Sequence, residues 1–319
     1  MLDEEKKLDK RLVIYAGEKM YSSQGGEEET SVRKRQPKRE WLEYRNSAWD
    51  MKLIKKRLGV EVIVEDTKDL SKKALAVDEK SASALAENWL EQARGLEGDP
   101  RELLIETARW YMALSEDLEE KGAAGFTTIC SSIEHRYGCN PCFAFMMLAN
   151  QGYGFSCGID INGLLTELIL ARAEPGAMFQ GNLELKSLPK GKVSIHHCMA
   201  PYAMDSEGEF NVRYAHSKPE RRGLVSAIRF KKGPVTLARL DSSLDLIHVS
   251  SGELVDYINH IDRCINEAVI EVPSPDDFDR KRIKPRSPSK LVHYVMKYGD
   301  SVDAACEVAG ELGIECLRS

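Results

Sequence analysis

Two acidic residues stand just beyond short apolar runs, in positions suited to chemistry. Glu134 follows the run at 125–129, Asp160 follows the run at 154–157, and an apolar helix is expected between them. Carboxylates beside an apolar wall can bind a metal ion or transfer protons, because a dry site strengthens electrostatic interactions and shifts pKa values. The alternative is structural: Glu134 could pair with Arg136 or cap a helix, and Asp160 could cap the helix that follows it.

The cysteines form a second candidate site. Cys139 and Cys142 make up a single C-x-x-C, which on its own is weak evidence for zinc, iron–sulfur or redox chemistry. Pro141 is expected in the first turn of a helix, where a nearby thiol would have a lowered pKa. The alternative is that the cysteines are small buried residues. Their dispersion predicts reduced thiols rather than a disulfide framework, and they stand at positions 130, 139, 142, 157, 198, 264, 306 and 316.

Length and composition limit the class of protein. The chain has 319 residues, enough for two or three domains, since single cores rarely grow past about 250 residues. Hydrophobic residues make up 42% of it, charged residues 30%, and the net charge is -6. This balance is typical of a soluble globular protein and disfavours a nucleic-acid partner. No apolar run approaches the roughly 20 residues of a membrane span and the N-terminus lacks an apolar signal core, so we predict a cytoplasmic protein with no membrane partner.

The elements that must position the two carboxylates alternate between strands and helices. A strand at 12–16, a helix at 41–58 and a strand at 60–64 are typical of a parallel α/β layer. Further elements are expected as helices at 79–94, 100–121, 141–151 and 161–173 and as strands at 126–130 and 153–157. The alternation predicts a doubly wound parallel sheet, in which ligands bind beyond the carboxyl ends of the strands. Glu134 and Asp160 both fall there.

The pattern changes after Pro175, where short strands are separated by turn residues. Strands are expected near 192–198, 210–216, 224–231, 234–240 and 245–250, with hairpin connections at 232–234 and 241–243. This region should be an antiparallel barrel or sandwich. We therefore predict an N-terminal α/β domain at 1–122, a central α/β segment carrying the site at 123–175, a β-barrel-like domain at 176–290, and a strand–helix unit at 291–319 that returns to the α/β or barrel domain.

Several short segments, in this order and spacing, resemble the L-fucose and L-arabinose isomerase superfamily over roughly residues 10 to 317. They are GFTTICSSIEHRYG, ANQGYGFSCGIDING, FQGN, IHHCMAP and VHYVMKYGD. The resemblance implies α/β layers followed by an antiparallel β-barrel, with a divalent metal where they meet and without the first N-terminal domain of the longer members. It also implies a homo-oligomer, a trimer or hexamer, with sites at subunit contacts.

The resemblance implies roles for individual residues. Glu134, His197 and His293 match metal ligands, and one acid with two imidazoles is a plausible partial shell for Mn²⁺, with zinc or iron less favoured. Asp160 holds the third position of a motif that reads Glu-Gly-Asp in the family, and it is a candidate ligand and, with Glu134, a candidate catalytic group. Asn182 aligns with an acid found in fucose isomerases, and an amide cannot exchange a proton near neutral pH.

A basic stretch at 213–222 supplies further candidates for binding. His216 and Arg221 could form a subsite for an anion or a sugar acid, since guanidinium groups bind carboxylates bidentately. Asn182 joins them as a candidate substrate-binding residue. The plain alternative is a solvated basic turn.

These residues support three functional hypotheses. The first is a metal-dependent isomerase-like enzyme, an aldose–ketose isomerase or epimerase, that acts on a sugar or sugar acid by enediol proton transfer. The second is a catalytically reduced member of the same fold that binds a carbohydrate or metabolite without converting it, motivated by Gly158 and Asn182. The third is a thiol-rich metal or redox protein.

Overall fold

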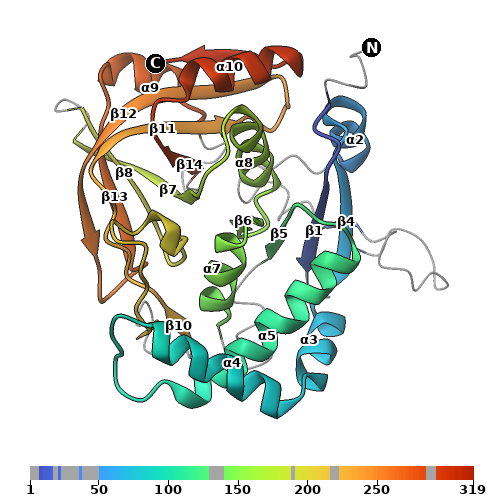
Figure 1. The fold of residues 1–319 in the computed structure, drawn as a ribbon. Coiled ribbons are helices and arrows are strands. Elements are labelled where there is room, and N and C mark those ends of the chain that lie inside the picture. Colours follow the sequence, from blue (N-terminus) through green and yellow to red (C-terminus); the bar gives the residue numbers. More distant parts are fainter. Residues whose placement is uncertain are drawn as a thin grey trace.

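The computed structural model describes residues 7–16, 21–22, 36–37, 50–128, 140–187, 191–215, 223–284 and 292–319. It contains a parallel sheet and a closed antiparallel barrel, and helix α8 (Ile161–Ala173) lies between them (Figure 1). The α/β class with an antiparallel barrel is therefore confirmed, and the choice between barrel and sandwich is settled in favour of a barrel. The doubly wound arrangement stays a prediction.

The parallel sheet has the strand order β4-β1-β5-β6. These strands are β1 (Arg11–Ala16), β4 (Glu61–Asp66), β5 (Gly125–Thr128) and β6 (Gly154–Cys157). Alternate residues of β1 enter different apolar clusters, Val13 and Tyr15 one of them and Leu12 and Ile14 the other. Both faces of β1 are thus buried, which explains why its sequence reads as a continuous apolar run.

The helices of this part pack against the sheet or against one another through their apolar faces. They are α2 (Met51–Leu58), α3 (Thr67–Ala76), α4 (Glu79–Gln92), α5 (Arg101–Glu120) and α7 (Cys142–Asn150). Asp50 caps α2 through the Leu53 N–H, and Gly59 ends it at a φ of 72°, a left-handed conformation that glycine adopts without strain. Within the described residues this helix begins at Met51, and the earlier part of the helix expected at 41–58 lies largely outside them.

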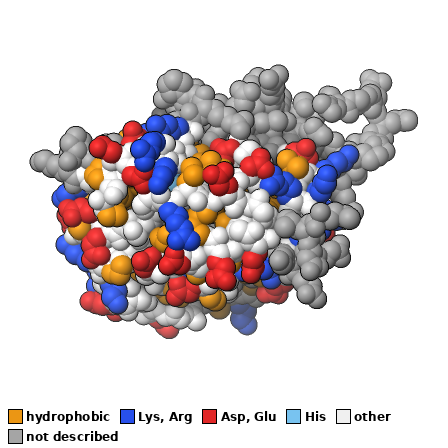
Figure 2. All heavy atoms as spheres, turned by 90° about the horizontal axis from the view of Figure 1, so that it is seen from above, with side chains coloured by type: hydrophobic (Ala, Val, Ile, Leu, Met, Phe, Trp, Pro, Cys, Tyr) orange, Lys and Arg blue, Asp and Glu red, His pale blue; other side chains and the backbone are white. Residues whose placement is uncertain are grey.

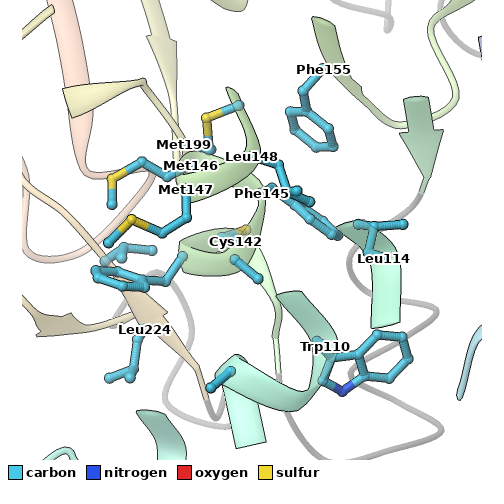
Figure 3. Packing of buried hydrophobic residues seen from close by; sticks show 14 of the residues in the cluster. Trp110, Leu114, Cys142, Phe145, Met146, Met147, Leu148, Phe155, Met199 and Leu224 are labelled. Atoms are coloured by element: carbon cyan, nitrogen blue, oxygen red, sulfur yellow. The ribbon is translucent and has the colours of Figure 1, made fainter. Parts of the chain in front are cut away.

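Helix α7 is apolar around its whole circumference, so it is buried on all sides. Figure 3 shows its side chains between Trp110 and Leu114 of α5 and residues from the second half of the chain, Met199 and Leu224. The α7 residues labelled there are Cys142, Phe145, Met146, Met147 and Leu148. This helix therefore joins the core of the sheet to the segment that follows the barrel strand β8 (Lys192–His197).

The barrel has six antiparallel strands in the order β11-β14-β7-β8-β13-β12, and β12 pairs again with β11 to close it. The other strands are β7 (Met178–Ser187), β11 (Gly233–Leu240), β12 (Leu246–Asn259), β13 (Asn266–Glu271) and β14 (His293–Tyr298). β14 lies between β11 and β7, so the late strand completes the barrel wall. The barrel encloses its own apolar cluster, which includes Phe179, Ile195, Leu237, Ile270 and Met296.

Shorter elements complete the fold. They are β2 (Tyr21–Ser22), β3 (Gln36–Pro37), the 3-10 turn η5 (Tyr202–Met204), β9 (Arg213–Tyr214), β10 (Leu224–Val225), α9 (Pro275–Lys281), α10 (Val302–Glu311) and β15 (Glu315–Arg318). β15 pairs in parallel with β12. None of the helices in the described ranges is long and apolar enough to cross a membrane.

One prediction about the cysteines is wrong. Cys306 of α10 and Cys316 of β15 form a disulfide, whereas the dispersed cysteines predicted reduced thiols. Helix α10 packs against β15, which brings the two Cα atoms to 5.4 Å, within the range that a disulfide spans. Cys142, Cys157, Cys198 and Cys264 are reduced.

Charges are mixed on the surface shown in Figure 2, where acidic and basic side chains alternate around small apolar groups. The coloured part of this face therefore shows no large patch of one sign.

Candidate functional site

Asp160 stands at the end of a turn with an unusual backbone. After β6, Gly158 has a φ of 74° and Ile159 a φ of 57°. A β-branched residue in this left-handed region costs about 1–3 kcal/mol, so the surrounding structure must hold it. Ile159 is buried, and the Gly158 N–H donates to the Thr128 carbonyl at 2.9 Å. The turn therefore fixes the place of Asp160 firmly, as functional sites often require.

Both carboxylate oxygens of Asp160 are engaged. Oδ1 accepts hydrogen bonds from the Gly163 N–H at 3.0 Å and from Arg239 Nη2 at 2.9 Å. Oδ2 accepts from Arg239 Nη1 at 2.6 Å and from His293 Nδ1 at 3.1 Å. The bond to Gly163 confirms that Asp160 caps α8. The three side chains of Asp160, Arg239 and His293 have no exposed surface, so this ion pair joins the sheet side of the molecule to β11 and β14 of the barrel.

The partners of Asp160 also decide its charge. Burial alone would raise the pKa of Asp160, but Arg239 and His293 outweigh burial and lower this pKa well below its usual value. An ionised carboxylate of such low pKa is a weak proton acceptor. The Arg239 guanidinium also contacts both of its oxygens. In this geometry Asp160 orients His293, and its expected roles as a metal ligand and a catalytic group stay predictions.

His197, His293 and Asn182 meet at one end of the barrel. The ring centres of His197 and His293 are 5.3 Å apart, with the ring planes at 84°. Asn182 of β7 lies opposite His293 in one pairing and opposite His196 in the other. All three predicted side chains are buried, with exposed fractions of 7% for His197, 0% for His293 and 8% for Asn182. Strands far apart in sequence thus bring four of the predicted residues, counting Asp160, to one junction.

The hydrogen bond from His293 to Asp160 selects a tautomer. Because Asp160 is ionised, it can only accept, and His293 Nδ1 must carry the proton. The other ring nitrogen, Nε2, is then the one with a lone pair. A carboxylate that orients a histidine in this way is typical of metal-binding and proton-transferring imidazoles.

The spacing of the two imidazoles fits one shared ion. A metal–nitrogen bond is about 2.1 Å long and a ring centre lies about 1 Å beyond the nitrogen, so two imidazoles on one ion place their centres about 5 Å apart. The observed 5.3 Å agrees with this value and equally with the edge-to-face packing of two rings. Within the described part of the chain, no group of three or more histidine, cysteine or acidic side chains could hold a metal ion. A metal ion between these two imidazoles would therefore require a further ligand from outside the described residues.

Three predicted site residues lie outside the described residues. They are Glu134, His216 and Arg221, and Cys130 and Cys139 lie outside them as well. The expected roles of Glu134 as ligand and catalytic group, and of His216 and Arg221 in substrate binding, stay predictions.

Arg239 and Gln180 belong to the site although the sequence did not single them out. The available signal in the sequence was an arginine inside the apolar strand GPVTLARL. Arg239 is fully buried in the structure, and arginine is almost never buried without a partner. Gln180 packs against the start of α8, and a Cβ at Gly163 would lie 1.5 Å from its Nε2 atom. This nitrogen is buried and has no hydrogen-bond acceptor among the described residues, so a polar group reaches the junction from β7.

A second buried carboxylate, Glu267 of β13, lies opposite His196. It binds His260 at 2.5 Å, Lys186 at 3.0 Å and Arg263. Burial would raise its pKa, but the hydrogen bonds from His260 and Lys186 outweigh burial and lower the pKa to about 2. Three basic partners compensate this single charge, so the cluster stabilises the barrel wall.

A search against protein-family models and a search of curated proteins find no match for this chain.

Proposed function

We propose that this chain is a metal-dependent sugar or sugar-acid isomerase-like enzyme, related to the L-fucose and L-arabinose isomerase superfamily, whose α/β part is a doubly wound sheet. The observation that carries the proposal is the hydrogen bond of 3.1 Å from His293 to Asp160 beside the ring of His197. It supplies two oriented imidazoles at the junction of sheet and barrel, where a small polar ligand can be bound by residues from both parts.

The proposed roles follow from this geometry. His197 and His293 hold a divalent ion, Mn²⁺ in the first instance, together with Glu134. Such an ion polarises the carbonyl and hydroxyl oxygens of a bound sugar. Asp160 keeps His293 in the required tautomer, and Arg239 balances the charge of Asp160. Asp160 therefore acts through His293 and does not itself exchange the proton.

The remaining polar residues bind and orient the substrate. Glu134 is the candidate base that moves a proton between the two carbons of an enediol, because Asp160 is already paired and Asn182 is an amide. Asn182 can donate to and accept from a sugar hydroxyl. His216 and Arg221 would favour a substrate with a carboxylate. We also propose that the protein is a homo-oligomer whose substrate sites lie at the contacts between subunits.

The test is metal binding by matched histidine variants. Wild-type protein loaded with Mn²⁺ and dialysed should retain about one ion per chain, as measured by elemental analysis. His197→Gln and His293→Gln should each weaken Mn²⁺ binding by at least about 10- to 100-fold, the loss already typical of removing a residue that orients a ligand. His196→Gln is the control, because this neighbour of His197 contacts Glu184 at 3.9 Å and should leave binding unchanged.

Two results would contradict the proposal. Either the wild type retains no divalent ion, or the His197 and His293 variants bind as the wild type does while their circular dichroism shows a folded protein. An isomerase assay on a panel of aldoses and sugar acids then tests the reaction itself.

A catalytically reduced binding protein is the second candidate. It is favoured by the engagement of both Asp160 oxygens and by Gly158 and Asn182, which stand where the family carries acids. This candidate predicts calorimetric binding of a sugar without turnover. Turnover by the wild type that disappears in Glu134→Gln would exclude it.

A further inference from the structure

Two cysteines lie in contact at the end of the barrel. Cys198 directly follows β8, and Cys264 lies in the connection between β12 and β13. Because Asn266 pairs with His197, the chain segments just beyond this pair run side by side. The Sγ atoms of Cys198 and Cys264 are 3.3 Å apart.

The barrel holds this contact from both sides. The side chain of Asn266 is fully buried, and its Nδ2 donates to the Cys198 carbonyl at 3.3 Å and to the Ser226 carbonyl at 3.0 Å. On the other side, the His260 N–H donates to the Ile265 carbonyl at 2.8 Å and closes the turn that carries Cys264. The approach of the two sulfurs is therefore set by the strand pairing and by a buried amide.

A small pocket borders the contact on the side of Cys198. This pocket has a volume of about 10 Å³ and is lined by Cys198, Arg213, His260 and Arg263 among others. That volume admits about one water-sized molecule. Cys264 is the more exposed of the two cysteines, whereas Cys198 has an exposed fraction of 7%. Because of this greater exposure, Cys264 is the thiol that a small uncharged oxidant meets first.

We propose that Cys198 and Cys264 form a modification site for hydroperoxides, at which oxidation by two electrons joins them in a reversible disulfide. In the first step Cys264 Sγ attacks one oxygen of hydrogen peroxide, the O–O bond breaks, and Cys264 sulfenic acid and water result. In the second step Cys198 Sγ attacks the Cys264 sulfur, the S–O bond breaks, and the thiol proton leaves with hydroxide as water. Two thiols and one peroxide give one disulfide and two waters.

Only a small movement is required for the second step. A disulfide bond is about 2.05 Å long, so the sulfurs must approach by about 1.2 Å from their present separation. A side-chain rotation together with a slight shift of the exposed turn at 260–265 is sufficient. This inference does not depend on the proposed isomerase function.

The test is peptide mapping without reduction, for which the sequence is well suited. Trypsin places Cys198 in the peptide 193–213 and Cys264 in the peptide 264–280. Cys306 and Cys316 share the peptide 298–318, so their existing disulfide links no two peptides. After treatment with equimolar hydrogen peroxide, the linked pair 193–213 and 264–280 should be the predominant new disulfide, and dithiothreitol should remove it.

Variants distinguish this pair from general thiol oxidation. Cys198→Ser should abolish the link and leave Cys264 as a sulfenic acid that dimedone labels. Cys157→Ser, which removes a thiol elsewhere, should leave the link unchanged. The inference is overturned if Cys264 passes to sulfinic acid while Cys198 stays a thiol, or if the two peptides carry alkylated cysteines after oxidation. The wild-type map alone decides the matter if a variant does not fold.

Discussion

The Asp160–Arg239 pair shows how one buried contact at the residue scale can determine the function of a site. The sequence identified Asp160, His197, His293 and Asn182, and the structure brings them together. Arg239 was missed because its partner stands 79 residues earlier, and no local pattern reveals which buried charges pair across that distance. The sequence therefore predicted these four members of the cluster but not the ion pair between Asp160 and Arg239.

Removing the charge of Asp160 should strongly destabilise the fold. Asp160→Asn keeps an acceptor for the Gly163 N–H but removes the carboxylate charge from the buried ion pair with Arg239, which should cost about 3–5 kcal/mol in the free energy of unfolding. Urea denaturation measures this change. Asp69→Asn is the matched control: its ion pair with Lys72 is exposed, so its loss should cost less than about 1 kcal/mol. Equal losses in both variants would contradict the assigned role of the buried pair.

Glu167 predicts a pH dependence of stability. This residue of α8 is buried and accepts a hydrogen bond from the Phe155 N–H at 2.9 Å. Burial raises the pKa of Glu167 well above its usual value, and the nearby Asp160 raises it further. The folded protein therefore binds a proton that the unfolded chain releases above a pH of about 4.5, so the stability contributed by Glu167 falls as the pH rises from there towards the pKa of the folded state.

Glu167→Gln removes this titration while it keeps an oxygen acceptor for Phe155. The variant should be more stable than the wild type near neutral pH, and the difference should shrink towards a pH of about 4, where the wild-type carboxyl is neutral in both states. Denaturation across this pH range measures the effect. A constant difference at every pH would show that Glu167 does not titrate in this way.

Among the elements, those with clear caps were predicted best. α8 lies at the residues expected, because Asp160 caps it and a long apolar run follows. β12 extends to Asn259, well beyond the expected end at 250. The expected strand was too short because Ser250-Ser251-Gly252 reads as a turn. Here Gly252 instead allows strands to approach closely, since a Cβ would lie 2.7 Å from Ile270 Cγ2. β7, β13, α3 and α9 were not predicted at all.

The strands expected at 210–216 and 224–231 are only the two-residue strands β9 and β10. Side chains take the place of a strand partner there. The Ala227 N–H donates to Asn211 Oδ1, the Ile228 N–H to Asn266 Oδ1 and the Arg229 N–H to Asp205 Oδ2. Amide and carboxylate side chains can satisfy backbone donors without a ladder, and apolar alternation alone does not reveal this.

The contact between α8 and β7 gives a prediction at this scale. Gly163→Ala would place a Cβ 1.5 Å from Gln180 Nε2 and 3.3 Å from Arg239 Nη1, so Gln180 must move within a packed junction. The substitution should destabilise the protein by about 1–3 kcal/mol, as measured by urea denaturation. Gly310→Ala is the control, because no atom lies within 4 Å of its added Cβ in helix α10 and alanine should there stabilise by about 0.5–1 kcal/mol.

A double variant separates crowding from a general effect of alanine in α8. Gly163→Ala combined with Gln180→Ala should recover much of the loss, because the second change removes the obstructing side chain. If Gly163→Ala alone stabilised the protein, this result would contradict the expected crowding between residue 163 and Gln180.

For the whole molecule, the sequence predicted the succession of a parallel sheet and an antiparallel barrel but not how the barrel closes. The alternation of strands and helices, followed by a run of short strands, was enough to predict the parallel sheet and the antiparallel barrel. Closure depends on pairings between distant segments, such as β14 with both β7 and β11. Such pairings are decided by tertiary packing, which apolar periodicity within one strand does not encode.

The position of β14 in the barrel affects how the chain folds during its synthesis on the ribosome. Synthesis proceeds from the N-terminus, so Asp160, Asn182, His197 and Arg239 all emerge before His293. Until β14 pairs with β7 and β11, the growing chain exposes the unpaired edges of these two strands. The ion pair of Asp160 and Arg239 also lacks its contact with His293 during this time. A nascent chain stalled before residue 293 would consequently lack the contact between His293 and Asp160 and be prone to aggregate.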